Sequence, residues 1–215
     1  MATKKVFREK AVHLRLDPNI RAGHHKFVKT SGTQSKFGIS FEDLQSLSLF
    51  CKKENIKVTG LHAHIGSGIK DDSLWSKACE FLIATARDMF KDCRVLNLGG
   101  GFGVRERLKD RELSISKLAQ SFLKIKKAYP EYELWLEPGR YLVAEAGVLL
   151  CSVSQVKTKA SRNYLGVNLG MNSFLRPSLY GSCHEIVNLS AEGLQKEKKL
   201  YDVVGPICES GDVLG

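Results

Sequence analysis

The sequence predicts an α/β fold with a parallel sheet, followed by a smaller antiparallel β region. Strand and helix signals alternate through the first two-thirds of the 215 residues. This alternation is typical of parallel strands joined by crossover helices. After Arg140 the signals change to short runs of alternating Val, Leu and Thr with turns between them. A chain of this length suits one large or two small domains. We therefore expect domains at residues 1–145 and 146–215.

Four strands and three helices are predicted in the first part of the chain. The strands are KAVHLRLD (10–17), KVTGLHAHIGS (57–67), RVLNLGGGFG (94–103) and YELWLEPGR (132–140). The helices are FEDLQSLSLFCKKEN (41–55), SLWSKACEFLIATARDMF (73–90) and ISKLAQSFLKIKKAY (115–129). In the first helix, Phe41, Leu44, Leu47 and Phe50 recur at helical spacing. Ser114 or Ser116 is expected to cap the third helix, since a serine hydroxyl can accept a hydrogen bond from a free N–H of the first turn.

Composition excludes several classes of protein. The net charge is +10, but Lys and Arg are dispersed and mixed with acids, which favours solvated helix faces and an attraction for anionic ligands over nucleic-acid binding. No apolar run approaches the ~20 residues of a membrane span, and no signal peptide is recognised. The six cysteines form no CxxC pair and no zinc pattern. We expect a cytoplasmic protein that binds neither metal, membrane nor nucleic acid.

Polar and glycine residues gather where three successive predicted strands end. These are HIGS (64–67), GGG (99–101) and EPGR (137–140). Parallel α/β folds build their sites at the carboxyl ends of the strands. Taken singly, each has an ordinary structural explanation as well: a structural histidine, a tight turn or a surface ion pair.

The side chains at these ends suit a flat, phosphorylated ligand. His64 could stack on a ring, and Ser67 could bond a phosphate oxygen. Glycines let backbone N–H groups approach a phosphate because no Cβ intervenes. Glu137 could accept a hydrogen bond from a protonated ring nitrogen, and Arg140 could fork onto a phosphate or carboxylate. His62 shares the face of His64, so a metal pair is conceivable, although no third ligand stands nearby in the sequence.

Two further stretches carry candidate residues. MNSFLRPSLYGSCHEI places Arg176 and Tyr180 four residues apart, where they could bind a substrate carboxylate. GPICESGD sets Cys208 beside acids and a serine. From these residues alone, Cys208 could be a nucleophile, a metal ligand, a buried thiol or part of a site that a neighbouring chain completes.

Taken together, these motifs resemble those of one known enzyme family. GLHAHIGSG, LNLGGGFG, LEPGR, GMNSFLRPSLYGSCHEI and VVGPICESGD resemble the diaminopimelate decarboxylases, enzymes that depend on pyridoxal 5′-phosphate (PLP) and have an alanine-racemase-like barrel. The segment KTSGTQSKFGIS is also similar, and the match runs from about Val12 to Asp212. The resemblance implies the C-terminal half of a PLP-binding (β/α)8 barrel, about four βα units, followed by part of an antiparallel β domain.

The resemblance also implies a role for each matching residue. His64 would stack on PLP, Ser67 and the glycines would receive its phosphate, and Glu137 would pair with the pyridine nitrogen. Cys208 would be the catalytic acid that protonates the carbon from which CO₂ leaves, its loop completing the site of the neighbouring subunit in a homodimer. The implied cofactor-binding residues are His64, Ser67, Gly99, Gly100, Gly101, Glu137, Pro138, Gly139 and Arg140. The implied substrate-binding residues are Arg140, Arg176, Tyr180 and Glu209.

Two family features are missing from the sequence. The lysine that holds PLP covalently, in a context such as YAVKAN, has no counterpart, and neither does the tyrosine of a C-terminal GAY segment. We expect a chain truncated at both ends relative to the family. The implied reaction converts meso-2,6-diaminopimelate to L-lysine and CO₂. The alternatives are a related decarboxylase of ornithine, arginine or carboxynorspermidine, and a non-catalytic relic that binds PLP or a partner; Glu209 argues against ornithine.

Overall fold

The computed structural model describes residues 6–7, 10–20, 35–107, 109–191 and 199–215. The chain divides into two compact units, one of residues 1–104 and 111–146 and the other of residues 105–110 and 147–215. Each unit is described by itself. The N-terminal unit contains the parallel sheet, and the C-terminal unit contains a second, smaller sheet.

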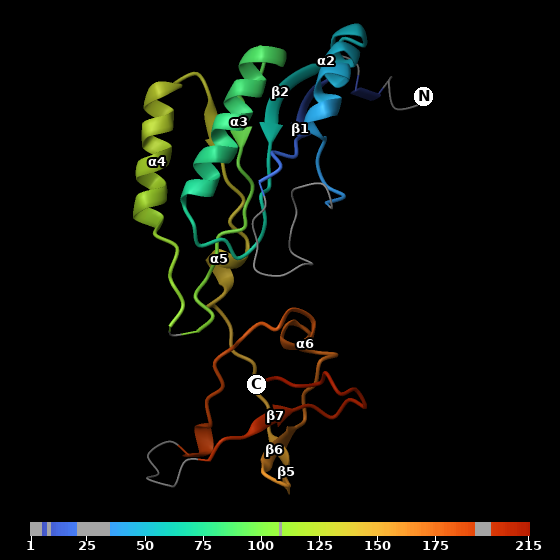
Figure 1. The fold of residues 1–215 in the computed structure, drawn as a ribbon, viewed down its shortest axis with the longest axis vertical. Coiled ribbons are helices and arrows are strands. Elements are labelled where there is room, and N and C mark those ends of the chain that lie inside the picture. The colour runs from blue at the N-terminus through green and yellow to red at the C-terminus, as the bar shows by residue number, and fades with distance from the viewer. Residues whose placement is uncertain (1–5, 8–9, 21–34, 108, 192–198) are drawn as a thin grey trace. The chain divides into compact units, whose positions relative to one another are not determined.

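The four predicted strands form the parallel sheet of the N-terminal unit. They are β1 (Ala11–Arg15), β2 (Lys57–His62), β3 (Val95–Asn97) and β4 (Glu133–Trp135), and they pair in the order β1-β2-β3-β4 (Figure 1). The strand order therefore equals the chain order. β3 and β4 have only three paired residues each, because the chain leaves the ladder where the glycine and proline motifs begin.

The helices cover one face of this sheet. A 3₁₀ turn (Phe41–Asp43) leads into α2 (Leu44–Lys53), followed by α3 (Ser73–Met89) and α4 (Ile115–Ala128). Apolar side chains of the strands pack with Trp75, Leu82 and other helix residues in one buried core. The three predicted helices are thus confirmed.

The face of the sheet opposite to the described helices is concave. The rings of His13 on β1 and Trp135 on β4 lie 5.4 Å apart, although three strand spacings of about 4.8 Å separate those strands along the sheet. Side chains of the first and fourth strands can meet only if the sheet curls towards this face. Such curvature fits a segment of a barrel wall.

Both ends of α4 are fixed by side chains. The hydroxyl of Ser114 accepts a hydrogen bond from the N–H of Lys117 at 3.4 Å, which identifies Ser114 as the cap. The ammonium of Lys126 donates to the carbonyl oxygens of Pro130 and Tyr132, each at 2.7 Å. These bonds tie the last turn of the helix to the start of β4.

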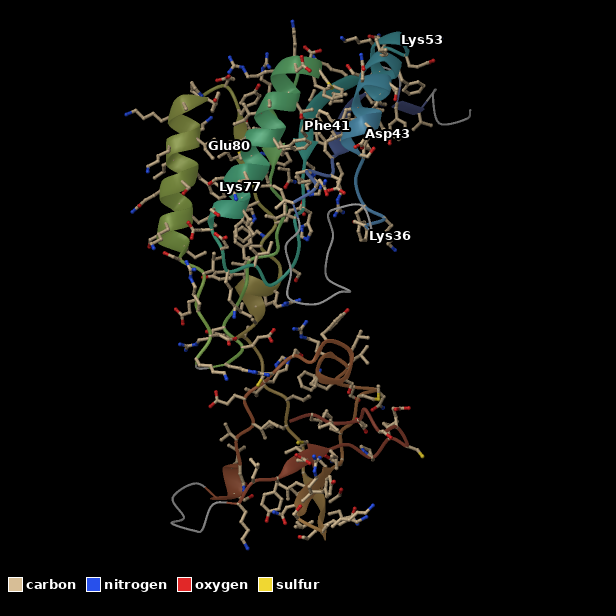
Figure 2. All side chains as sticks on the ribbon, in the orientation of Figure 1. Lys36, Phe41, Asp43, Lys53, Lys77 and Glu80 are labelled. Carbon is tan, nitrogen blue, oxygen red and sulfur yellow. The ribbon has the colours of Figure 1, made fainter. Side chains whose placement is uncertain are left out.

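Many basic residues lie on solvated surfaces, as the sequence predicted. Lys53 lies at the end of α2, and Lys77 and Glu80 lie on the exposed side of α3 (Figure 2). None of the described helices is both long and apolar enough to cross a membrane.

The second sheet is mixed rather than purely antiparallel. β5 (Val153–Lys159) and β6 (Arg162–Val167) pair antiparallel, as predicted, whereas β7 (Asp202–Val204) pairs parallel to β6. Three short helices lie among the described residues after residue 139: α5 (Arg140–Val143), α6 (Arg176–Tyr180) and a 3₁₀ turn (Leu189–Ala191). Of these, α5 belongs to the N-terminal unit and the other two belong to the C-terminal unit.

Candidate active site

A pocket opens in the N-terminal unit beyond the carboxyl ends of β2, β3 and β4. Its volume is about 210 Å³, and its lining residues are His64, Ser67, Gly101, Phe102, Glu137, Gly139, Arg140 and Tyr141. Six of these were selected from the sequence alone. The other three selected in this unit lie alongside: Gly99 and Gly100 are buried and Pro138 is half-buried. The structure thus brings the three predicted strand-end motifs to one place.

Glycines are required here because two loops pass close together. Gly99 has φ +65°, and a Cβ there would lie 2.7 Å from the carbonyl oxygen of Ala63 and 2.8 Å from Nδ1 of His64. Gly101 has φ +88°, and its Cβ would overlap the carbonyl oxygen of Gly66. Any side chain at either position would push the loop after β2 away from the loop after β3.

The imidazole of His64 is held in its neutral form. Its Nδ1 accepts a hydrogen bond from the N–H of Gly100 at 3.1 Å, so any ring proton is on Nε2. Burial is the main cause that lowers the pKa of His64, and the charge of Arg15 adds to it; the charge of Glu137 and a backbone hydrogen bond with Gly66 act in the opposite direction. A neutral ring faces the pocket at pH 7.

Asn97 connects the glycine loop to the carboxylate of Glu137. Its Nδ2 donates to Oε1 of Glu137 at 2.8 Å, and its Oδ1 accepts from the N–H of Gly99 at 2.9 Å. The backbone N–H of Glu137 donates in turn to the carbonyl of Gly99 at 2.9 Å. One oxygen of the carboxylate is therefore fixed. Asn97 was missed from the sequence, where its only signal is a polar residue on a strand just before the glycines.

His62 lies next to the same carboxylate. Its Nε2 is 3.6 Å from Oε1 of Glu137 and is buried without a hydrogen bond from the described residues. Burial lowers the pKa of His62, and the charges of Arg15, His64 and His13 add to this, whereas Glu137 raises it. The conceivable metal pair of His62 and His64 gains no third ligand, since the described residues contain no group of three or more His, Cys, Asp or Glu side chains suited to a metal.

Aromatic packing stiffens the pocket wall. Trp75 is fully buried, and its Nε1 donates to the carbonyl of Gly100 at 3.3 Å. Its ring stacks on Phe102 with centroids 4.8 Å apart, and Phe102 meets Tyr141 edge-on at 6.2 Å. The glycine loop is thereby anchored to the core through α3.

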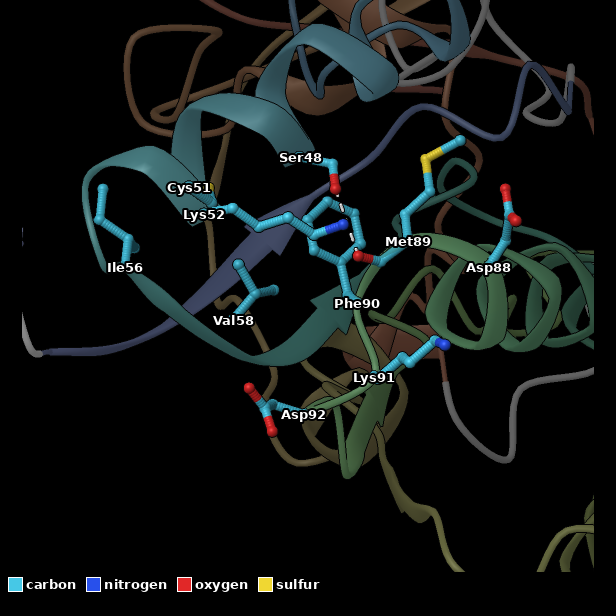
Figure 3. Close-up of a pocket in the computed structure, with 10 residues that line it drawn as sticks. All are labelled: Ser48, Cys51, Lys52, Ile56, Val58, Asp88, Met89, Phe90, Lys91 and Asp92. Carbon is cyan, nitrogen blue, oxygen red and sulfur yellow. Dashed lines mark hydrogen bonds between the residues drawn. The ribbon is translucent and has the colours of Figure 1, made fainter.

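A second hollow of about 260 Å³ lies between α2 and the end of α3. A hydrogen bond from Ser48 Oγ to the carbonyl of Met89 at 3.2 Å links the two helices beside it, and the carboxylates of Asp88 and Asp92 lie on opposite sides of it (Figure 3). Burial raises the pKa of its Cys51 thiol. No residue selected from the sequence lines this hollow, and its charges do not converge, so we regard it as a packing groove.

The remaining selected residues lie in the C-terminal unit. On α6, the guanidinium of Arg176 lies 5.7 Å from the ring centre of Tyr180, and its Nη2 is 3.3 Å from Oε1 of Glu106. Cys208 and Glu209 are exposed on the loop that follows β7. Glu209 Oε1 accepts from the N–H of Gly211 at 3.4 Å. Of the six cysteines, Cys51, Cys79 and Cys93 are buried, Cys183 is half-buried, and Cys151 and Cys208 are exposed.

Comparison with known proteins identifies the family. Residues 2–144 match the pyridoxal binding domain of the pyridoxal-dependent decarboxylases, and residues 81–215 match the C-terminal sheet domain. The chain belongs to the pyridoxal-dependent decarboxylases. The diaminopimelate decarboxylase of Haemophilus influenzae is 36% identical over 208 residues, which cover 95% of this chain and 50% of that protein. That of Escherichia coli K12 is 35% identical over 211 residues, with 94% and 50% covered. The predicted family is therefore confirmed.

Solved structures agree with the predicted fold. Diaminopimelate decarboxylase from Helicobacter pylori, solved in complex with L-lysine, superposes with a TM-score of 0.86 at 30% identity, covering 99% of this chain and 53% of that one. Diaminopimelate decarboxylase from M. jannaschi gives a TM-score of 0.81 at 29% identity, with 99% of this chain and 51% of that one covered. The chain spans about half the length of the relatives that it matches.

Proposed function

We propose that the chain carries the cofactor-binding pocket and the substrate loop of a diaminopimelate decarboxylase, which converts meso-2,6-diaminopimelate to L-lysine and CO₂. The observation that carries this proposal is the convergence of His64, Ser67, Gly101, Glu137 and Arg140 on one pocket. The similarity to diaminopimelate decarboxylases over nearly the whole chain supports the substrate.

The lining of the pocket fits PLP. A neutral imidazole suits the face of an aromatic ring, a carboxylate suits a protonated ring nitrogen, and a hydroxyl, a guanidinium and glycine backbone suit a phosphate. A Cβ at Gly101 would overlap the carbonyl oxygen of Gly66, so this glycine lets the loop that bears Ser67 pack closely against the glycine loop. When bound, PLP supplies an electron sink for the amino acid that loses CO₂.

The residues of the pocket hold and orient the cofactor. His64 would stack on the ring of PLP, and its neutral imidazole would place no positive charge against a protonated ring nitrogen. Glu137 keeps one oxygen on Asn97 and has the other for the ring nitrogen. Ser67, Gly99–Gly101 and Arg140 would bind the phosphate, and Pro138 and Gly139 form the turn that precedes Arg140.

The C-terminal unit supplies the substrate contacts in this proposal. Cys208 delivers a proton from Sγ to the carbon that loses CO₂, and Glu209 binds the distal ammonium group. Arg176 and Tyr180 bind the substrate carboxylate; one donor of Arg176 is engaged by Glu106, and a guanidinium has five. The Cys208 loop completes the site of a second subunit in a homodimer.

PLP titration of the purified chain tests the pocket. We expect reversible binding, seen as a change in visible absorbance, with no single lysine trapped by borohydride in the intact mass. Glu137→Gln should weaken binding by about 10- to 100-fold, because a hydrogen bond to a charged group is lost. Asp88→Asn, which changes a carboxylate in the other hollow, is the matched control. Equal affinity of wild-type chain and Glu137→Gln would refute the assigned pocket.

The reaction itself is tested by adding a polypeptide that bears the PLP lysine. CO₂ release is measured with meso-diaminopimelate, ornithine and arginine. We expect release with meso-diaminopimelate and its loss in Cys208→Ala. Release with ornithine or arginine instead would favour a related decarboxylase. The solved arginine and lysine/ornithine decarboxylases, at 18% and 20% identity, support only a shared fold.

A further inference from the structure

The loop that bears Cys208 ends in a buried carboxylate. Asp212 is 3% exposed, whereas the residues from Pro206 to Gly211 are exposed. Burial of a carboxylate is unfavourable unless hydrogen bonds replace those of water. The proposed chemistry assigns no role to this side chain, so its burial requires another explanation.

Both oxygens of Asp212 are engaged by backbone groups from separate segments. Oδ1 accepts from the N–H of Met171 at 2.6 Å, and Oδ2 accepts from the N–H of Ile207 at 2.8 Å. The main chain of Asp212 adds two bonds: its carbonyl accepts from the N–H of Gly205 at 3.0 Å, and its N–H donates to the carbonyl of Glu209 at 3.0 Å. One residue thus closes the loop at both ends and fastens it to the segment after β6.

The surrounding backbone is shaped to this carboxylate. A Cβ at Gly170 would lie 2.7 Å from Oδ2 of Asp212. A Cβ at Gly205 would overlap the same oxygen and would lie 2.5 Å from Cα of Gly170. Two glycines on different segments therefore leave the space that the carboxylate fills. A further hydrogen bond, from Ser178 Oγ to the carbonyl of Gly211 at 2.6 Å, holds the residue that directly precedes Asp212.

We propose that Asp212 is a positioning residue that sets the backbone of the loop bearing Cys208 and Glu209. Cys208 follows directly on Ile207, whose N–H is bonded to Oδ2, and Glu209 bonds through its carbonyl to the N–H of Asp212. The two exposed residues are thereby held between fixed points on either side. What Cys208 and Glu209 do rests on the proposed function, but the anchoring of the loop does not.

Amide hydrogen exchange on the full chain tests the anchoring. Asp212→Asn keeps the shape but leaves one acceptor for two N–H groups. We expect exchange at Ile207 or Met171 to become at least tenfold faster, because a bond to a charged group protects more than a neutral one. Asp202→Asn is the matched control, since Asp202 is a half-exposed β7 carboxylate 3.5 Å from Arg162.

A spin label on Cys208 gives a spectroscopic readout that general stability would not change. Cys151 and Cys183 are replaced by serine, and the label mobility is compared between Asp212 and its variants. Mobility should rise in Asp212→Asn and further in Asp212→Ala, while a label placed on Cys151 in a matched background should be unaffected.

The outcomes separate the possibilities. Unchanged exchange at both amides, or an acceleration of equal size throughout β5 and β6, would overturn a positioning role. If Asp212→Ala does not fold, the positioning role of Asp212 is tested with Asp212→Asn alone. Neither readout involves PLP or substrate, so a negative result would leave the proposed function standing, and failure of PLP binding would leave the anchoring standing.

Discussion

Replacing Gly99 with alanine should destabilise the N-terminal unit by two separable effects. Gly99 has φ +65°, a region in which a residue with a Cβ is disfavoured by about 1–2 kcal/mol. The new methyl would also lie 2.7 Å from the carbonyl oxygen of Ala63 and 2.8 Å from Nδ1 of His64. Forcing a methyl into a packed site costs about 1–3 kcal/mol.

The sum is a loss of about 2–5 kcal/mol in the free energy of unfolding. Alanine variants at two other glycines show how much the backbone effect and the steric effect each contribute to this loss. At Gly103, which does not have a positive φ, a Cβ would lie 2.7 Å from the carbonyl oxygen of Ile69, so Gly103→Ala should show the steric part alone. At Gly139 a Cβ would meet nothing within 4 Å, so Gly139→Ala should stay within about 0.5 kcal/mol of wild type.

Urea unfolding followed by tryptophan fluorescence measures all three variants. The chain has two tryptophans, Trp75 and Trp135, and both lie in the same compact unit as the three glycines. The signal therefore reports the unfolding of this unit. Gly99→Ala should also weaken PLP binding, because the methyl displaces His64. A loss in Gly99→Ala no larger than that in Gly103→Ala would refute the addition of the two effects, and a loss close to that of Gly139→Ala would refute the close packing of the loops.

Three further predictions concern single side chains. Burial lowers the pKa of folded His64 below its ordinary 6.5, so its contribution to stability should be complete above pH 6.5 and lost as the pH falls through the lowered value, by up to about 1.4 kcal/mol per pH unit. His64→Gln should remove this dependence; a difference from wild type that is constant from pH 5 to 8 would contradict it. Asn97→Ala should lower the free energy of unfolding by about 1–2 kcal/mol, because two hydrogen bonds of a half-exposed amide are lost, and an unchanged urea midpoint would disprove this. Burial raises the pKa of Cys79 to about 12 from the ordinary 9.0, so iodoacetamide at pH 8 should modify it roughly a thousandfold more slowly than a thiol with the ordinary pKa. Peptide mass spectrometry measures this rate against the exposed Cys151, and similar rates at both cysteines would argue against the buried position of Cys79.

The elements of the N-terminal unit could be predicted because their signals are local. The apolar spacing of α2 and the alternation in β1 are visible in windows of a few residues. The direction of β7 could not be predicted, since three residues carry no information about a partner that lies about 35 residues earlier in the chain. It pairs parallel to β6, and that choice depends on the connection between them.

The candidate site was partly predictable for the same reason. His64 and Glu137 follow strands directly, and the carboxyl ends of neighbouring parallel strands must meet at one edge. Asn97 acts on a carboxylate that is 40 positions away in sequence, and no local pattern shows that pairing. In the sequence Asp212 is simply the last residue of the motif GPICESGD. Nothing in the sequence indicates that its carboxylate is buried.

The agreement between strand order and chain order has a consequence for biosynthesis. Each strand from β2 to β4 pairs with the strand that immediately precedes it, so its partner has already left the ribosome when it emerges. The sheet can therefore grow one βα unit at a time at translation speed, about 5–20 residues per second. Each new strand covers the free edge of the strand made just before it, which shortens the time during which nascent chains could associate through that edge.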